Sequence, residues 1–263
     1  MDLGLKDRVA IVAAASRGLG KAVALELARE GARVAICARD AGSLNRAARE
    51  IRQATGVEPV TEVVDVTDRP RVEQFVAAVE QRCGRLDICV TNAGGPPAKK
   101  FADLTLEDWR MAVDLTLMSA IYFARAVLPR MQRNRWGRLV TITSVSVKQP
   151  IDGLLLSNSI RAAVTGLART LANEYATDGI TVNNVCPGYT RTERLDELAA
   201  AMASSEGVSR ETIFERWASQ VPMRRLARPE EFAALVAFLC SERASYINGA
   251  TIAVDGGWVK SLL

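Results

Sequence analysis

The stretch that decides the fold reads Val9-Ala10-Ile11-Val12-Ala13-Ala14-Ala15-Ser16-Arg17-Gly18-Leu19-Gly20. Its first five residues are apolar and predict a buried strand, and the small residues after them predict a tight turn. Apolar residues then recur at helical spacing until Gly31 supplies a stop signal. A strand, a glycine turn and a helix in this order can bind a pyrophosphate, because the amide groups at a helix N-terminus attract anions. The residues expected at such a dinucleotide site are Ala14, Ser16, Arg17, Gly18, Leu19 and Gly20.

The turn has the pattern AxxxGxG, one glycine short of the strongest dinucleotide-binding form. Ala14 stands where that form has its first glycine, and its methyl group crowds the turn where the backbone should approach phosphate most closely. Ordinary turn formation is therefore the alternative interpretation of this stretch.

Length and composition indicate a globular chain with a sizeable core. The chain has 263 residues, of which 49% are hydrophobic, and this length suits one large α/β domain or two small ones. Neither a repeat nor a low-complexity linker divides the sequence, so we expect a single domain over residues 1–263. The segment from Met1 to Asp7 lacks the apolar region of a signal peptide, so we expect a cytoplasmic protein.

The composition also excludes several kinds of chemistry. The five cysteines are scattered without a CxxC pair, which favours reduced core thiols over disulfides or metal ligands. Histidine is absent, which removes Ser-His-Asp and Cys-His catalysis, and we expect no metal site. The net charge of +4 is spread along the chain without a basic block, so nucleic acid is not an expected partner. No run reaches about 18 unbroken apolar residues, so we expect no membrane span.

Short β-rich runs alternate with helical stretches, the pattern of a parallel sheet covered on both faces. The expected strands are Val9 to Ala13, Arg33 to Cys37, Pro59 to Val64, Leu86 to Thr91, Arg138 to Thr143, Ile180 to Cys186 and Thr251 to Val254. The polar, helix-prone residues 189–221 interrupt this alternation before the last strand. We expect this insertion to cover a ligand as a lid.

The residues after the second strand indicate the type of dinucleotide. Ligands of a parallel sheet bind outside the carboxyl ends of its strands, and NAD-selective folds commonly place an acidic residue at this strand end against the ribose 2′-hydroxyl. Here the strand is followed by Ala38 and Arg39. Together with Arg17, Arg39 favours a 2′-phosphate, so the expected cofactor is NADP(H).

Motifs at later strand ends carry a more specific signal. They are Asp65, Thr91-Asn92-Ala93-Gly94-Gly95, Asn183, Pro187-Gly188 and Asp255-Gly256-Gly257. In this order and at these separations they resemble the short-chain dehydrogenase/reductase family over essentially the whole chain, and 3-oxoacyl-(acyl carrier protein) reductases in particular. The resemblance implies an α/β fold, a single Rossmann-type doubly wound domain with a seven-stranded parallel sheet. It also implies an oxidoreductase with a small-molecule substrate.

The resemblance assigns roles at the cofactor site as well. The positions that it implies are Asp65, Val66, Asn92, Ala93, Gly94, Pro187, Gly188 and Thr192. Asp65 would contact the adenine, and Asn92 to Gly94 would border the adenosine ribose and brace the sheet. Thr192 would reach the nicotinamide end. Ordinary capping of strand ends is the alternative for Asp65 and Asn92.

The catalytic positions depart from the family pattern. Its reductases have a serine after the fifth strand, then a tyrosine followed at the fourth position by a lysine, with an asparagine on the preceding helix. Ser144 matches the serine, but Ser157 holds the tyrosine position, Arg161 the lysine position and Thr116 the asparagine position. A serine hydroxyl is a much poorer acid than a phenol, and a guanidinium cannot relay a proton.

Three interpretations of this site remain open. The first is an NADP(H)-dependent oxidoreductase with a rebuilt site, whose proton comes from Tyr189, from Lys148, or from a water held by Ser144 and Ser157. The second is a catalytically weak or inactive relative that binds a dinucleotide. The third is a non-redox enzyme on the same fold.

The helix expected from Thr105 to Asn134 carries apolar residues on more than one face. One contact with the sheet does not require so many. The family resemblance implies an assembly through this region, so we expect a homo-oligomer, either a dimer or a tetramer.

Overall fold

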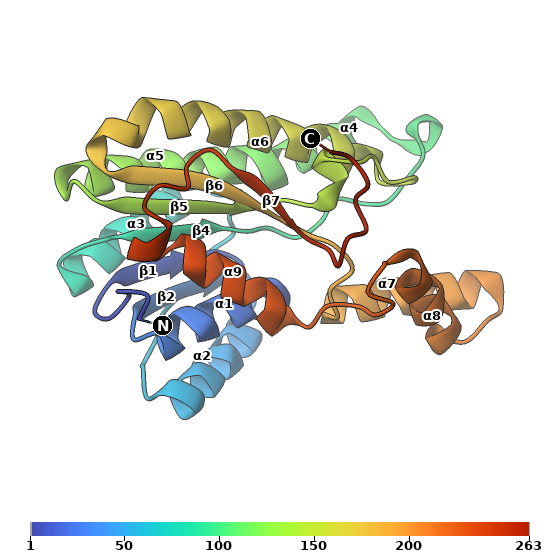
Figure 1. Ribbon diagram of the computed structural model, residues 1–263, viewed down its shortest axis with the longest axis horizontal. Coiled ribbons are helices and arrows are strands. Elements are labelled where there is room, and N and C mark those ends of the chain that lie inside the picture. Colours follow the sequence, from blue (N-terminus) through green and yellow to red (C-terminus); the bar gives the residue numbers. More distant parts are fainter. Residues whose placement is uncertain (1, 263) are drawn as a thin grey trace.

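A computed structural model of the chain describes residues 2–262. Its strands form one seven-stranded sheet in the order β3-β2-β1-β4-β5-β6-β7 (Figure 1), and every pairing is parallel. The strands are β1 (Val9–Val12), β2 (Arg33–Ala38), β3 (Val60–Val63), β4 (Ile88–Thr91), β5 (Gly137–Ile142), β6 (Ile180–Pro187) and β7 (Thr251–Val254). The predicted fold class, a single α/β domain with a seven-stranded parallel sheet, is confirmed.

Helices cover both faces of the sheet. They are α1 (Gly18–Arg29), α2 (Ala41–Thr55), α3 (Arg69–Cys83), α4 (Leu106–Val113), α5 (Ser119–Arg133), α6 (Leu155–Tyr175), α7 (Glu193–Glu206), α8 (Arg210–Gln220) and α9 (Pro229–Leu239). Figure 1 shows α1, α2 and α9 on one face and α5 and α6 on the other. The buried residues divide in the same way, because one apolar cluster joins the sheet to α1, α2 and α9 and a second joins it to α3, α5 and α6.

Strand β1 shows why its sequence is apolar throughout. Ala10 and Val12 belong to the first cluster, whereas Val9 and Ile11 belong to the second. Successive side chains of a strand point to opposite faces, so a central strand between two helical layers needs apolar residues at every position. The five cysteines are free, and all but the half-buried Cys83 lie in the interior, in agreement with their expected role as core residues.

The connections position the site. Both β2 and β4 pair with β1. The strands of the first half of the chain therefore extend the sheet on one side of β1, and those of the second half extend it on the other side. In open parallel sheets a ligand binds in the crevice that forms at such a reversal, outside the carboxyl ends of the strands. Local signals fix the neighbouring helix α2, because Asp40 accepts a hydrogen bond from the Ser43 amide at its start and Gly56 ends it with a left-handed backbone.

The segment predicted as one helix from Thr105 to Asn134 has an irregular centre. Helix α4 passes into a π-helical turn, Asp114–Met118, and then into α5. Among residues 2–262, the combined helix Leu106–Arg133 is the one helix long and apolar enough to cross a membrane by length and composition. Half of its most apolar window is buried inside the fold, which is typical of a core helix in a globular protein.

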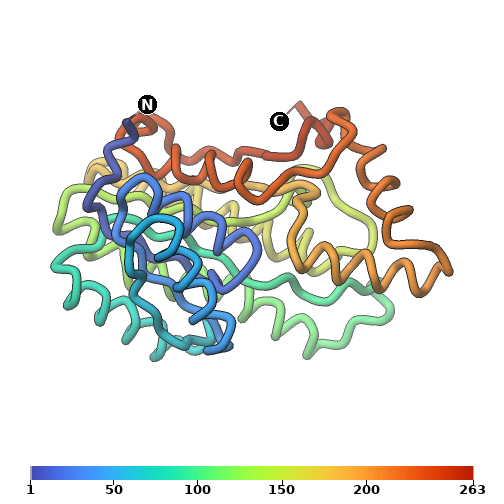
Figure 2. Tube along the Cα trace, turned by 90° about the horizontal axis from the view of Figure 1, so that it is seen from below, coloured from blue at the N-terminus to red at the C-terminus, as the bar shows by residue number. Residues whose placement is uncertain are grey.

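The insertion at residues 189–221 forms helices α7 and α8. Both project beyond the end of the sheet (Figures 1 and 2). They have a small apolar core of their own, which includes Ala199, Ile213 and Trp217. We refer to residues 189–221 as the lid segment.

Candidate active site

A cavity of about 980 Å³ opens at the carboxyl ends of the central strands. It is large enough for a dinucleotide-sized ligand. The predicted site residues that line it are Ala14, Ser16, Arg17, Gly18, Leu19, Arg39, Val66, Asn92, Ala93, Gly94, Ser144, Ser157, Arg161, Pro187, Gly188 and Thr192. Two residue sets predicted separately, for the cofactor and for catalysis, therefore lie along one continuous cavity.

The glycine turn is held tightly against the sheet. The Asn92 side chain donates a hydrogen bond to the Ala14 carbonyl at 3.2 Å, which links the ends of β1 and β4. A Cβ atom on Gly20 would lie 2.6 Å from that carbonyl oxygen and 2.9 Å from the Asn92 amide nitrogen. Gly20 itself does not line the cavity, so its role is to let α1 approach β1 closely.

The N-terminus of α1 fits a phosphate group. Arg17 occupies its N-cap position without a side-chain hydrogen bond to the helix, and the first turn contains no acidic residue. The first amide groups of α1 therefore have no capping group on their own helix, and Gly18 presents no side chain to the cavity. Such a cradle suits the pyrophosphate of a dinucleotide.

Charged side chains line the cavity beside the start of α2. They are the basic Arg39, Lys21 and Arg46 and the acidic Asp40 and Glu50, and Glu50 pairs with Lys21 at 2.8 Å. The residue directly after Arg39 is Asp40. Its carboxylate accepts a hydrogen bond from the Ser43 amide. That hydrogen bond lowers the pKa of Asp40. The carboxylate therefore caps the N-terminus of α2. Asp40 was not among the predicted site residues, although its spacing from Ser43 is that of an N-cap.

Asp65 lies beside the cavity and does not line it. Its carboxylate accepts hydrogen bonds from the amide and the hydroxyl of Thr67. Its neighbours Val64 and Val66 line the cavity in its place. The structure thus places apolar side chains where the family resemblance suggested contact with the adenine.

Three serines lie together at the predicted catalytic end of the cavity. The Ser144 hydroxyl accepts a hydrogen bond from the Ser146 amide at 3.1 Å, and the Ser146 and Ser157 hydroxyl oxygens lie 3.4 Å apart. Ser144 and Ser157 line the cavity, and Ser146 is buried behind them. Sequence reasoning missed Ser146, whose only sequence signal is its place two residues after Ser144.

Arg161 lies one helical turn after Ser157 on α6, and it is buried. One terminal nitrogen of its guanidinium donates to the carbonyls of Ile142, at 3.2 Å, and Thr143, at 3.0 Å, at the end of β5. Burial lowers its pKa to about 10. No acidic side chain among residues 2–262 pairs with it, so the charge is held by backbone dipoles alone.

Thr116 lies in the π-helical turn between α4 and α5 and is 6% exposed. Its hydroxyl oxygen has no hydrogen-bond partner among the described residues. Thr116 and Arg161 line a second cavity of about 10 Å³ beside the main one, which has room for about one water molecule. The wide π turn therefore turns a polar side chain toward the catalytic end.

Two predicted proton donors lie outside the main cavity. The Tyr189 ring is stacked between Trp258 and Trp217, at centroid distances of 4.2 Å and 5.3 Å, and burial raises the pKa of its hydroxyl. That hydroxyl donates to Gln220 at 3.5 Å. Lys148 is half-buried in the segment after Ser144 and does not reach the cavity lining. The structure thus groups Ser144, Ser157, Arg161 and Thr116 but leaves Tyr189 and Lys148 apart.

Comparisons with known proteins show which proteins the whole chain resembles. The profile of the family described as enoyl-(acyl carrier protein) reductase matches residues 13–259. A 3-oxoacyl-(acyl-carrier-protein) reductase of Pseudomonas aeruginosa is 35% identical over 259 residues, which are 98% of this chain and 100% of that protein. A tropinone reductase homolog of Arabidopsis thaliana is 35% identical over 255 residues, 97% of this chain and 91% of its own length.

A solved structure extends the similarity to three dimensions. The crystal structure of L-sorbose reductase from Gluconobacter frateurii, in complex with NADPH and L-sorbose, superimposes with a TM-score of 0.96. The two sequences are 33% identical, and the match covers 100% of both chains. The similarity therefore includes the lid segment and the whole cavity.

Proposed function

Since the chain belongs to the short-chain dehydrogenase/reductase family, we propose that it is an NADP(H)-dependent oxidoreductase that acts on a carbonyl or hydroxyl substrate through an atypical active site. The observation that carries this proposal is the single cavity that joins the glycine turn to Ser144, Ser157 and Arg161. Its shape lets a dinucleotide place its reactive end beside these three side chains.

Charge at the ribose end supports NADP(H). Arg17 and Arg39 line the cavity there, and Asp40 is committed to the start of α2. A 2′-phosphate would meet guanidinium groups, which bind phosphate with two parallel hydrogen bonds. The L-sorbose reductase that this chain resembles was solved with NADPH.

The chain's own residues would hold and polarise the substrate. When bound, the reduced nicotinamide supplies a hydride for the carbonyl carbon. The Ser144 and Ser157 hydroxyls can donate hydrogen bonds to the carbonyl oxygen, and the Arg161 charge favours the negative charge that develops there. Neither hydroxyl is an efficient acid at neutral pH, so a solvent water held by the serines would complete the proton transfer.

A weakly active dinucleotide-binding protein is the second candidate function. The arrangement around Arg161 favours it, because its guanidinium donates to backbone carbonyls and no phenol stands beside it. The loss of a general acid typically lowers a rate by about 10²- to 10⁴-fold. The two candidate functions predict different rates of turnover but the same binding of the cofactor.

A double substitution tests the catalytic proposal. We expect Ser157→Tyr with Arg161→Lys to increase NADPH-dependent reduction of simple ketone and 3-oxoacyl substrates by at least about tenfold over the wild type. The pair restores a phenol and an ammonium that lowers its pKa. Either single substitution should give less, since each lacks one of the two groups.

The measurement is steady-state NADPH oxidation for the wild type, both single variants and the double variant, with NADPH binding followed by calorimetry. Ser157→Ala is the matched control for the hydroxyl. Fast wild-type turnover that survives Ser157→Ala would show that the proton comes from elsewhere. Tight NADPH binding without turnover in the wild type would support the second candidate function.

We also propose that the chain forms a homo-oligomer and that the lid segment covers the substrate. Leu106 and Met111 on α4 are 75% and 52% exposed, and Phe101 just before it is 75% exposed. Large apolar side chains gathered in one region favour contact with another subunit. Light scattering at micromolar concentration should give a multiple of the chain mass, and a monomer mass would contradict this prediction. The cytoplasmic location stays a prediction.

A further inference from the structure

The first turn of the lid helix α7 lies directly against the glycine turn. The Thr192 Cβ atom and a Glu193 carboxylate oxygen lie 3.7 Å and 3.8 Å from the point that a Cβ on Gly18 would occupy. Glu193, Arg194 and Leu195 line the same cavity as Gly18. The acidic Glu193 of the lid segment therefore stands, beside the basic Arg194, at the end of the cavity where the phosphates of a dinucleotide are expected.

A second acidic side chain of α7, Glu197, binds a residue of the predicted cofactor site. The Glu197 carboxylate accepts a hydrogen bond from Arg17 at 3.0 Å, across 180 positions of sequence. Both side chains are more than half exposed, at 59% for Arg17 and 51% for Glu197. Arg194, on the same helix, lies 3.9 Å from the same carboxylate. Arg17 thus already has an anionic partner that belongs to the lid segment.

We propose that Glu197 is a specificity-determining residue for the cofactor, because its carboxylate competes with the 2′-phosphate of NADP(H) for Arg17. The inference rests on the proposed function, which assigns Arg17 to that phosphate. A guanidinium that forms a forked pair with a phosphate cannot hold the same geometry on a carboxylate. Binding of the 2′-phosphate therefore breaks a contact between the lid segment and the glycine turn, whereas binding of NAD(H) leaves that contact in place.

Glu193 provides an internal contrast on the same helix. Its carboxylate faces Gly18, at the N-terminus of α1, where both cofactors would carry the same pyrophosphate. Removal of its charge should favour both dinucleotides alike. Removal of the Glu197 charge should favour only the one with a 2′-phosphate.

The expected effects are moderate, because the Arg17–Glu197 pair is exposed. Exposed ion pairs change an equilibrium by about two- to fivefold, and salt screens them. Glu197→Gln should therefore lower the Kd for NADPH by about two- to fivefold at low salt, with NADH unchanged. The difference should shrink at an ionic strength of about 1 M.

The experiment measures the Kd of NADPH and of NADH by calorimetry for the wild type, Glu197→Gln and Glu193→Gln. Glu206→Gln is the matched control, because Glu206 lies on α7 but pairs with Arg216 of the lid segment at 2.7 Å. We expect the control to match the wild type. An unchanged or raised Kd for NADPH in Glu197→Gln would overturn the proposal, and so would an equal decrease for both cofactors.

A double-substitution cycle separates this proposal from the proposed function. In an Arg17→Ala background, Glu197→Gln should have no further effect on NADPH. Adenosine 2′,5′-bisphosphate and adenosine 5′-phosphate serve as smaller probes with and without the 2′-phosphate, and only the first should respond to Glu197→Gln. If the wild type binds neither the dinucleotides nor these probes, the cofactor assignment fails together with the inference. If it binds NADPH and the cycle shows no coupling, only the inference fails.

Discussion

Two buried arginines lie at opposite ends of strand β5, and they are paired very differently. Arg138, near the start of the strand, is 2% exposed, and Arg161, at the carbonyls of its last residues, is 8% exposed. Burial lowers the pKa of both guanidinium groups. Arg138 donates to the carbonyls of Ser241, Gly137 and Gly179 and lies 3.7 Å from the Glu242 carboxylate.

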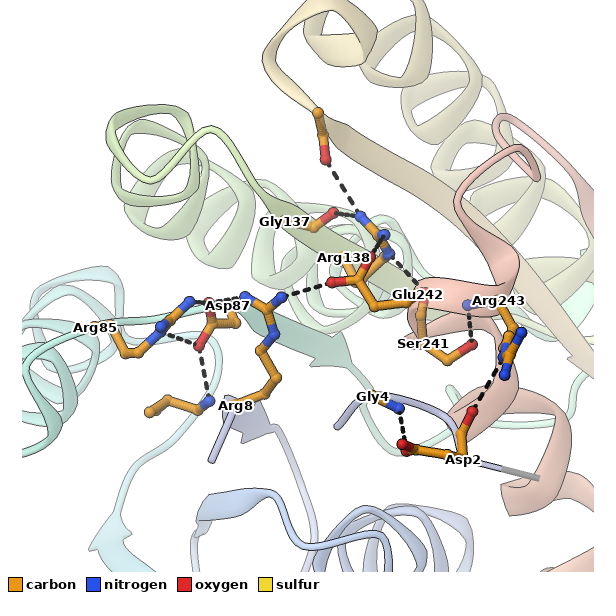
Figure 3. A network of polar contacts seen from close by, with 12 residues as sticks. Asp2, Gly4, Arg8, Arg85, Asp87, Gly137, Arg138, Ser241, Glu242 and Arg243 are labelled. Atoms are coloured by element: carbon orange, nitrogen blue, oxygen red, sulfur yellow. Dashed lines mark hydrogen bonds and ion pairs between the residues drawn. The ribbon is translucent and has the colours of Figure 1, made fainter. Parts of the chain in front are cut away.

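The surroundings of Arg138 form a closed polar network (Figure 3). Glu242 also accepts a hydrogen bond from Arg8, and Arg8 in turn lies 3.3 Å from the fully buried Asp87. The Trp136 ring packs against both Arg8 and Arg138, at 3.8 Å and 4.2 Å from its centroid. Arg8, Asp87, Arg138 and Glu242 thus each have an opposite charge or a ring beside them.

Within residues 2–262, the partners of Arg161 are two carbonyls, both reached by the same nitrogen. A buried charge without a counter-charge does not stabilise a fold, because its loss of hydration is not offset. The two ends of β5 thus differ, with a paired network at one end and a guanidinium without a counter-charge beside a large cavity at the other. This contrast favours the carboxyl end as the location of the proposed active site.

The largest expected effect concerns the paired arginine. Arg138→Met should lower the free energy of unfolding by about 3 kcal/mol, because it leaves buried carbonyls and the Glu242 charge without their partner. Arg161→Met should lower it by less, by about 1 kcal/mol, because removal of an uncompensated charge offsets part of the cost of the two carbonyls that lose their donor. Urea unfolding of both variants measures the difference.

The two methionine substitutions should affect cofactor binding and turnover in the opposite order to their effects on stability. Arg161→Met should weaken cofactor binding or turnover, while Arg138→Met, measured where it is still folded, should retain both. Glu73→Gln, which removes an exposed pair with Arg69 on α3, is a control that should change stability very little. Equal losses of stability from the two methionine variants would remove the distinction between the two ends of the sheet.

The fold was predictable because short, mainly apolar runs alternate with helical stretches, and the first of these runs, β1, is apolar at every position. The helix from 105 to 134 was predicted as continuous, and the structure inserts the π-helical turn at Asp114–Met118. A π turn adds one residue to a helical period, and an apolar pattern with residues on several faces does not reveal it. The sequence therefore predicts that Thr116 belongs to the site. It does not predict the π-helical turn in which Thr116 lies, nor that its hydroxyl has no hydrogen-bond partner among the described residues.

The candidate site was predictable where it depends on strand ends and not where it depends on packing between distant segments. Asn92 follows β4 directly and Ser144 stands two positions after the end of β5, so their place at the cavity follows from the parallel sheet. The stacking of Tyr189 between Trp217 and Trp258 joins three segments, and no local pattern indicates it. The pair of Arg17 with Glu197 depends in the same way on how the lid segment docks.

The smallest expected effect lies in the glycine turn, where Ala14 has a positive φ of 48°. This left-handed backbone costs an L-residue about 1–2 kcal/mol, and glycine adopts it without that cost. Ala14→Gly removes the strain but adds freedom to the unfolded chain, which offsets about 0.4–1 kcal/mol. The net result should be a gain of about 0.5–1 kcal/mol in the free energy of unfolding, measured by urea denaturation.

The neighbouring Ala15 supplies the matched control. It is fully buried and has no positive φ, so Ala15→Gly should lower the free energy of unfolding by about 1 kcal/mol. Opposite signs at adjacent alanines would show that backbone conformation, and not side-chain size, decides the first effect. A loss of stability in Ala14→Gly would mean that the methyl group of Ala14 stabilises the turn through packing. In that case Ala14, which stands where the strongest pattern has a glycine, would be adapted to its place in this cavity. NADPH binding by Ala14→Gly should then be no tighter than in the wild type.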